Sequence, residues 1–405
     1  MSSQPAFPPE IQEAILNHLA LVDFTSLKTC SLVCRAFVPI TRKHIFASIE
    51  LNITTKSPTV HSLERLLAGN PGLAEYIRNL KYNVLWGDLT NPSVLEVLKQ
   101  INKLQSLSIW FTPPAGQRQG LDWINNPLRP AILHLLHLPT LLRLQLAGIY
   151  DLVAADFIPC TSLQSLSIFS HVQAKVDSAD DAFSGPLPPQ PVQLKEWITG
   201  VKTWSVISAF CKAQRPDGRP VFDFSSLERV TAQIDRANDV PALHELFGRS
   251  THLTNVDLTY WQPEWISTNL SDLLRPSIGT LKHLRVSLHV NGVDSDPLAG
   301  IPGELENFRA ESEKTNVLKS LDIHVLVQTD EDCRTGEDWG RLDEVLAKPG
   351  WPKLKKVSLH IEIASYGRQD TRLADALNKL PQEQLKKLAG NEALNFDFKV
   401  TNTLV

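Results

Sequence analysis

The sequence predicts an α/β protein: a small helical module over residues 1–48, then an irregular solenoid over residues 49–405 with parallel strands inside and helices outside. Three observations predict this fold. Apolar residues recur at helical spacing near the N-terminus. A hexapeptide that is apolar at its first, fourth and sixth positions then recurs along the chain. Between its copies lie stretches with helical apolar spacing, and stacked strand–helix units of this kind form solenoids.

The N-terminal module is expected to contain short helices. Pro8 and Pro9 open the first helix, because the first turn does not use the N–H group that proline lacks. Asp23 is the expected N-cap of a second helix, since its side chain can accept hydrogen bonds from the first turn. A third helix is expected to carry Leu32, Val33, Ala36 and Phe37, with Pro39 near its start or breaking it, and the first strand is expected over residues 48–53.

Copies of the hexapeptide are the main fold signal. Good copies begin at Leu104, Leu141, Leu163, Leu253, Leu281, Leu318 and Leu354, and weaker ones at Ile77, Leu194 and Leu227. Their starts lie roughly 22 to 37 residues apart, which overlaps the leucine-rich range of about 20–29. A single copy could be a chance apolar hexamer, but seven good copies predict repeats that share one core. The asparagine or cysteine usual after the third apolar position is missing from nearly every copy, so the arc is expected to be irregular.

Helices are expected between the copies, over residues 60–67, 94–101, 128–138, 242–247, 270–274 and 339–346. The segment of residues 171–193 interrupts the pattern with an acidic cluster and a proline-rich run. This composition buries too little apolar area to offset the entropy of ordering, so a flexible insert is expected there. A proline segment that binds a partner is the alternative.

Bulk composition excludes several classes of protein. The chain has 405 residues, 42% hydrophobic and 21% charged, with a net charge of -4 from 40 basic and 44 acidic residues. Nucleic-acid binding is not expected, because such proteins usually carry a basic excess. Without an apolar run of about 18 residues or a secretory signal, no membrane contact is expected. Five cysteines give no disulfide framework, so cytoplasm or nucleus is the expected compartment.

Motifs of catalysis and cofactor binding were sought without success. The sequence has no phosphate loop, no strand-linked dinucleotide fingerprint and no nucleophile elbow. Cys30 and Cys34 could share a helix face, but no second cysteine pair lies nearby to complete a zinc site. His134 and His137 are more simply capped or partly exposed histidines, and Cys211 lacks an evident base. We therefore expect no enzyme, no catalytic residue, no metal and no cofactor.

The N-terminal residues resemble an F-box. The resemblance rests on the opening Pro8-Pro9-Glu10-Ile11, the pair Ile15-Leu16, the middle pair Asp23-Phe24, the run Leu32-Val33-Cys34-Arg35, and Phe37. Phe7 stands where leucine is usual, and Phe37 where tryptophan is common. Both departures keep apolar bulk, so the docking face is expected to persist.

The rest of the chain resembles the leucine-rich-like region of F-box proteins that are abundant in mushroom-forming fungi. The sequence segments that resemble this region are residues 273–284, 339–343 and 349–352. The resemblance implies the substrate-receptor subunit of a Skp–cullin–F-box ubiquitin ligase. Its F-box would bind a Skp-type adaptor, and through it a cullin–RING ligase, while the repeats select a target protein. The alternative is a leucine-rich-repeat interaction scaffold whose F-box-like start is only a structural cap.

Two sets of binding residues follow. The resemblance implies adaptor binding by Pro8, Pro9, Glu10, Ile11, Ile15, Leu16, Leu32, Val33 and Phe37. For Leu32 and Val33, packing into the module's own core is an equal alternative. In each repeat the fourth and sixth positions point inward, so the third, fifth and seventh should face the concave side of the sheet. There we expect target binding by Trp110, Arg143, Phe169, Arg229, Asp257, Trp261, His283, Arg285, His289, Asp322, His324, Lys356 and His360.

These side chains suggest the chemistry of the target. Aromatic residues come first in the set, and histidine, arginine and lysine dominate its C-terminal part. A partner with an acidic patch is the natural complement, and protonated histidines would tighten its binding as the pH falls towards about 6. The alternative is a solvated polar sheet face without a partner.

Overall fold

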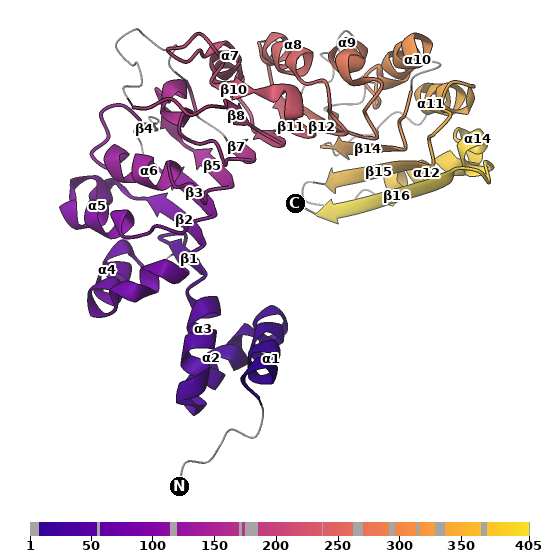
Figure 1. The fold of residues 1–405 in the computed structure, drawn as a ribbon. Coiled ribbons are helices and arrows are strands. Elements are labelled where there is room, and N and C mark those ends of the chain that lie inside the picture. The colour runs from indigo at the N-terminus through magenta and orange to yellow at the C-terminus, as the bar shows by residue number, and fades with distance from the viewer. Residues whose placement is uncertain are drawn as a thin grey trace. The chain divides into compact units, whose positions relative to one another are not determined.

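The computed structural model describes residues 8–54, 57–113, 120–169, 172–174, 185–236, 238–261, 270–290, 296–312, 316–328, 337–365 and 371–404. The fold is α/β, with a 12-stranded parallel sheet and helices between most successive strands (Figure 1). The sheet order is β1-β2-β3-β5-β7-β9-β11-β12-β13-β14-β15-β16, and two short pairs join β4 with β6 and β8 with β10. The chain divides into two compact units: unit 1 is residues 1–163 with 183–192, and unit 2 is residues 164–182 with 193–405.

Unit 1 begins with helices as expected, but the prediction for the third was wrong: Leu32 and Val33 end the second helix, and the third begins only at Val38, after a 3-10 turn. The elements are α1 (Pro9–Val22), α2 (Phe24–Val33), the 3-10 turn η1 (Arg35–Phe37) and α3 (Val38–Ile45), followed by β1 (Ser48–Leu51). Asp23 caps α2 as predicted, because its Oδ1 accepts hydrogen bonds from the N–H groups of Thr25 and Ser26 at 3.1 and 3.0 Å. Leu16 and Leu27 are the buried apolar side chains of these helices. The module thus has a very small core of its own.

The remainder of unit 1 alternates strands and helices. Its strands are β2 (Asn79–Val84), β3 (Ser106–Phe111), β4 (Leu121–Asp122), β5 (Arg143–Ala147) and β6 (Ile149–Tyr150). Its helices and 3-10 turns are α4 (Val60–Gly69), η2 (Pro71–Tyr76), η3 (Trp86–Thr90), α5 (Pro92–Lys99), α6 (Arg129–Leu136) and η4 (Ala154–Phe157). The helices predicted between the copies in this part of the chain are confirmed to within two residues at each end.

Unit 2 repeats the alternation. Its strands are β7 (Ser165–Ile168), β9 (Glu196–Thr199), β10 (Phe222–Asp223), β11 (Arg229–Ile234), β12 (Asn255–Tyr260), β13 (His283–Val290), β14 (Ser320–Val327), β15 (Lys356–Ser365) and β16 (Asn395–Leu404), with β8 (Val192–Gln193) at its border. Its helices and turns are α7 (Trp204–Lys212), η6 (Phe224–Ser226), α8 (Asp239–Arg249), α9 (Leu270–Leu274), η8 (Arg275–Ser277), α10 (Ile301–Ser312), α11 (Glu337–Ala347), α12 (Thr371–Asn378), α13 (Leu380–Glu383) and α14 (Lys386–Ala389). The helices expected here are confirmed, most closely α9.

Each hexapeptide copy becomes a strand that starts at its third position. In unit 2 the copies pair in register, so that equivalent apolar positions lie side by side: Val256, Leu284, Leu321 and Val357 at the fourth position, and Leu258, Val286, Ile323 and Leu359 at the sixth. All of these side chains are at most 3% exposed. Burying each contributes roughly 1.5–3 kcal/mol, which is why the repeated pattern specifies one register.

A backbone feature fixes where each strand starts. The carbonyl at the second position of a copy accepts hydrogen bonds from two successive N–H groups of the next copy. The carbonyl of Lys282, for example, accepts from Lys319 at 2.8 Å and from Ser320 at 3.1 Å. The same arrangement recurs from Arg78 in unit 1 to Lys319 in unit 2. We call it the double-acceptor carbonyl.

The predicted flexible insert of residues 171–193 lies partly outside the described residues, which omit 170–171 and 175–184. Of its C-terminal part, residues 185–193 are described, and Val192 there is buried. The prediction of a flexible insert therefore stays a prediction.

Candidate functional site

The helical module exposes seven large apolar side chains. We call them together the module face: Ile11, Ile15, Leu21, Val22, Phe24, Leu32 and Val33. Their exposed fractions run from 42% at Phe24 to 86% at Leu32. So many exposed apolar side chains on a module of this size are typical of a surface that binds a partner.

Most of the side chains predicted to bind an adaptor are accessible. Pro8, Pro9 and Glu10 are exposed at the start of α1, and Phe37 is half-buried in η1. Ile11 and Ile15 lie one helical turn apart, with 47% and 53% of their surface exposed. Leu32 and Val33, 86% and 74% exposed, do not pack into the module's core.

Leu16 differs from the rest of the predicted set. Its side chain is 2% exposed, so it packs inside the module and is not on the surface that a partner would meet. Sequence reasoning also missed Leu21 and Val22 as surface residues, although they are 85% and 65% exposed. They end α1 on a run of four consecutive apolar residues, 19–22, and spacing alone could not tell which side faces inward.

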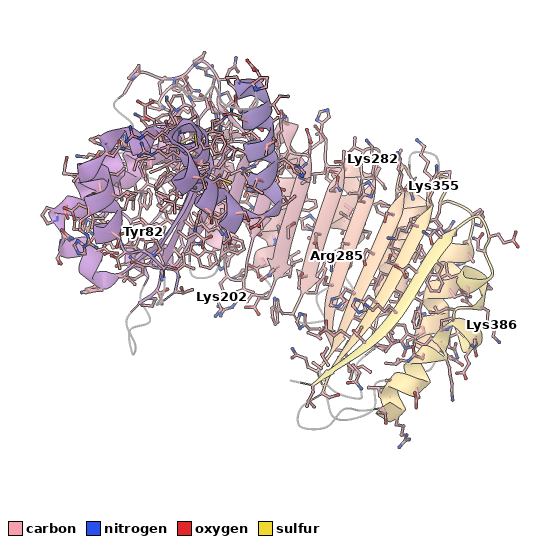
Figure 2. All side chains as sticks on the ribbon, turned by 90° about the horizontal axis from the view of Figure 1, so that it is seen from below. Tyr82, Lys202, Lys282, Arg285, Lys355 and Lys386 are labelled. Atoms are coloured by element: carbon pink, nitrogen blue, oxygen red, sulfur yellow. The ribbon has the colours of Figure 1, made fainter. Side chains whose placement is uncertain are left out.

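A second surface lies on the strands of unit 2. It is a depression of about 210 Å³ that we call the polar sheet face, lined by Arg285, Asp322, His324, Lys356, Ser358, Leu359, His360, Asp397 and Lys399. Figure 2 looks onto these strands, with Arg285 labelled among them. Five of the side chains predicted for target binding therefore meet in one place. Asp397 and Lys399, on β16, were missed because no hexapeptide copy precedes that strand.

Strand register explains why these side chains meet. Asp257, Arg285 and Asp322 are direct neighbours on β12, β13 and β14. His324 faces His360 on β15, which in turn faces Lys399. Carboxylates thus alternate with cations across the strands, and the face is mixed in charge rather than purely basic. Burial raises the pKa of Asp257, and Asp322 adds to that rise while Arg285 opposes it.

The histidines at the centre are close together. The ring centroids of His324 and His360 are 5.0 Å apart, and Nε2 of His324 lies 3.5 Å from Oε2 of Glu362. Nε2 of His360 is 2.9 Å from Oγ1 of Thr401. Burial lowers the pKa of His360, and the charges of His324 and Lys399 lower it further. At neutral pH the imidazole of His360 is therefore neutral.

Trp261 and His289 extend the same strands. Their rings stack with centroids 4.1 Å apart, and 38% of Trp261 is exposed. Burial lowers the pKa of His289, helped by His324, and its buried Nδ1 has no hydrogen-bond partner in the described part of the chain. A stacked indole and imidazole form a flat surface suited to an apolar or aromatic group.

Lysines line the starts of these strands. Lys282, Lys319 and Lys355 occupy the second position of successive copies, are all exposed, and follow one another through the double-acceptor carbonyls. Figure 2 labels the first and last of them. Within the described ranges none of the three has an ion-pair partner, and like charges on adjacent strands repel. This lysine row is the strongest basic feature near the polar sheet face.

The other predicted target-binding side chains lie apart from the depression. Arg229 pairs with Glu196 at 3.0 Å, and His283 is exposed at the start of β13. Trp110 belongs to unit 1, where its Nε1 donates to Oγ of Ser108 at 2.6 Å. Of the remaining predicted side chains, Arg143 is exposed on β5 and Phe169 is half-buried after β7.

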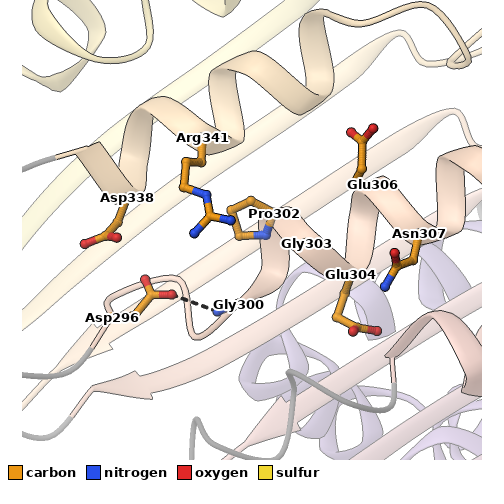
Figure 3. Close-up of a pocket in the computed structure, with 9 residues that line it drawn as sticks. All are labelled: Asp296, Gly300, Pro302, Gly303, Glu304, Glu306, Asn307, Asp338 and Arg341. Atoms are coloured by element: carbon orange, nitrogen blue, oxygen red, sulfur yellow. Dashed lines mark hydrogen bonds between the residues drawn. The ribbon is translucent and has the colours of Figure 1, made fainter.

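A third concavity, beside α10 and α11, is acidic (Figure 3). Its carboxylates have structural roles: Oε2 of Glu304 accepts from the N–H and hydroxyl groups of Ser271 at 2.9 and 3.0 Å. Asp296 likewise accepts from the N–H of Gly300 at 2.9 Å. Nothing at this concavity indicates a ligand.

Metal and nucleophile chemistry finds no support in the described ranges. No group of three or more His, Cys, Asp or Glu side chains there could hold a metal ion. Burial raises the pKa of the Cys211 thiol to about 12, so it is not a ready nucleophile. No helix in the same residues is both long and apolar enough to cross a membrane.

Neither the scan against protein-family models nor the search of curated proteins finds a match for this chain. The functional argument therefore rests on the module face and the polar sheet face.

Proposed function

We propose that the chain is the substrate receptor of a Skp–cullin–F-box ubiquitin ligase. In this proposal α1–α3 form an F-box that binds a Skp-type adaptor, and the strands of irregular leucine-rich-like repeats take up a target protein. The observation that carries the proposal is the module face. A helical module with so small a core would not leave seven large apolar side chains in water without a partner to cover them.

The energy available at the module face is sufficient for a stable complex. Full burial of a medium apolar side chain is worth roughly 1.5–3 kcal/mol, and a few well-placed residues usually carry most of an interface. Leu32 and Val33, which are the most exposed of the predicted set, have the most surface to bury. Ile11 and Ile15 add one ridge along α1.

The stacking of the copies supports the repeat half of the proposal. Parallel strands in sequence order, most of them begun at the same position of a hexapeptide and joined through a helix, are what a solenoid of degenerate repeats requires. On such a scaffold the polar sheet face and the lysine row offer a target both charge and hydrogen-bonding groups. An acidic segment of the target would meet the lysine row.

The alternative function is an interaction scaffold whose helical module caps the sheet. One observation favours it: the carbonyl of Ala47, just after α3, accepts hydrogen bonds from Arg78 and Asn79 at 2.9 Å each. The module is thus continuous with the first strands, as a cap would be. A cap, however, needs no apolar side chains on its outer surface, so the module face favours the receptor.

Association with a purified Skp-type adaptor tests the proposal. We expect the full chain to bind the adaptor in size-exclusion chromatography and calorimetry. The triple variant Ile11→Ser, Ile15→Ser and Val33→Ser should weaken binding by at least about 100-fold, which corresponds to roughly 2.7 kcal/mol. The matched control is Ile53→Ser, since Ile53 is 39% exposed in the loop after β1.

The outcomes separate the two functions. All three substituted side chains are exposed, so the triple variant should keep the unfolding midpoint of the wild type. If the wild type and the adaptor do not associate at micromolar concentration, the receptor proposal is wrong and the scaffold remains. Equal binding by the triple variant and the wild type would place the adaptor away from the module face.

A further inference from the structure

Unit 1 contains a concave surface of its own, here called the Trp86 groove. It consists of two depressions of about 320 and 220 Å³ that share Leu89 and Pro127. Its apolar wall is formed by Trp86, Leu89, Pro92, Leu95 and Pro127, and its polar end by Asp122, Asn126 and Tyr150. Trp86 is 54% exposed and leans on Phe111, with ring centroids 6.4 Å apart. A large indole half open to water in a groove is an anchor for a ligand.

Hydrogen bonds hold the wall that carries Trp86. Oδ2 of Asp88 accepts from the hydroxyl group of Tyr82 at 2.9 Å, from the N–H of Leu85 at 3.0 Å and from Nδ2 of Asn52 at 3.1 Å. These bonds fix the turn η3, which presents the indole. A wall that is already ordered costs a ligand less entropy on binding.

The polar end is equally ordered. Asp122 accepts from both the backbone N–H and the side-chain amide of Asn125, at 2.9 and 2.8 Å. Oδ1 of Asn126 accepts from the N–H of Leu128 at 2.9 Å, which leads the chain into α6. These bonds order the Asp122 carboxylate and still leave it lone pairs, so this end of the groove can also accept a hydrogen bond from a cation.

Two aromatic side chains supply the donors that a ligand in the Trp86 groove can reach. Burial and the charges of Asp122 and Asp151 raise the pKa of Tyr150, so its phenol keeps its proton. The indole N–H of Trp86 is the second donor. The amide Nδ2 of Asn126 also lacks a hydrogen-bond partner in the described chain, but it is buried below the groove surface and is not counted among these donors.

We propose that the Trp86 groove binds a proline-rich segment of a partner protein in the extended polyproline conformation. Such a segment presents carbonyl groups to the hydroxyl group of Tyr150 and the indole N–H of Trp86, while its prolines bring no N–H groups that would need acceptors. Its rings pack flat on the indole of Trp86, and aromatic-lined grooves recognise this conformation because little entropy remains to be lost. The Asp122 carboxylate favours a basic residue at that end of the segment.

Fluorescence anisotropy with the full chain tests this. The probe is a short labelled peptide with Pro-Leu-Pro-Pro repeats and one arginine at each end. We expect binding in the micromolar range, and Trp86→Ala should weaken it about tenfold or more, equivalent to roughly 1.4 kcal/mol. The matched control is Trp204→Ala, because Trp204 is a comparably exposed tryptophan, at 40%, in α7 of unit 2.

One further variant tests a donor. Tyr150→Phe keeps the ring, removes the hydroxyl group and should weaken binding about threefold. Adaptor binding should be unchanged in all of these variants, since none touches the module face.

Several results would overturn the proposal. The first is absence of binding at about 100 µM peptide, an affinity weaker than about −5.5 kcal/mol. The second is equal binding of a peptide in which every proline is replaced by alanine, since the polyproline conformation would then be irrelevant. The third is equal loss of affinity in the Trp86→Ala variant and the Trp204→Ala control.

Discussion

Asp343 connects two of the last helices of unit 2, and we predict that replacing it destabilises this unit. The residue lies in α11, is 4% exposed, and accepts two backbone hydrogen bonds from α14. Its Oδ1 accepts a hydrogen bond from the N–H of Leu388 at 2.8 Å, and its Oδ2 accepts one from the N–H of Lys387 at 3.1 Å. Since α14 precedes β16, this carboxylate ties down the strand that brings Asp397 and Lys399 to the polar sheet face.

The magnitude follows from those two bonds. A hydrogen bond to a charged group contributes about 1.5–3 kcal/mol, and a buried N–H left without an acceptor adds to the loss. Asp343→Ala should therefore cost about 3–5 kcal/mol. For a unit of this size that shifts the unfolding midpoint by roughly 6–15 °C. Asp343→Asn keeps one acceptor and should cost about half as much.

Thermal unfolding followed by circular dichroism measures the effect. The control is Asp375→Ala, because Asp375 is an exposed acid on the neighbouring helix α12 and its loss should stay within about 0.5 kcal/mol. The reasoning is refuted if Asp343→Ala behaves like this control, or if Asp343→Asn is as damaging as Asp343→Ala. Hydrogen exchange should locate the damage in α14 and β16.

Two further predictions concern the polar sheet face. The lowered pKa values of His289 and His360 mean that the unfolded chain takes up protons first as the pH falls, so stability should be constant above about pH 6.5 and decline below it. The double variant His289→Gln and His360→Gln should flatten that decline in unfolding curves, and an unchanged slope would contradict the assignment. Replacing His283, Arg285, His324 and Lys356 together by Ser should remove co-purified target proteins with the fold intact by circular dichroism. An unchanged set of partners would move target recognition to the loops at the strand ends.

Strand positions in this chain are predictable because one local pattern fixes them. The leucine at the first position is buried in every good copy except that of Leu354, which is half-buried, and the next apolar positions alternate, so both the start and the inward side of a strand can be read from six residues. Leu281 and Leu318 illustrate this, each preceding its strand by two residues. Asp23 was predictable for a similar reason, since capping depends only on residues two and three positions away.

Other features depend on contacts that no short pattern encodes. Strand β16 was missed because it carries plain alternation around Phe396 and Phe398 without the leading leucine spacing. Leu16 and Ile15 are adjacent and both apolar, yet only Leu16 is buried, since the packing of α2 and α3 decides which side of α1 faces inward. The contact between His324 and Glu362 depends on the register of β14 and β15, which no short pattern encodes. The missing hydrogen-bond partner of the Asn126 amide likewise becomes visible only once the surrounding residues are packed.

The double-acceptor carbonyl has a consequence for how such a chain tolerates insertions and deletions. Because most strands take their starting point from a carbonyl just ahead of the preceding strand, an added or lost residue in a connecting loop is absorbed within that loop. The next strand begins at the same place regardless, so errors in length do not accumulate along the chain. Connections of very different lengths can thus coexist, and loops are free to diversify in sequence while the strands they join stay in phase.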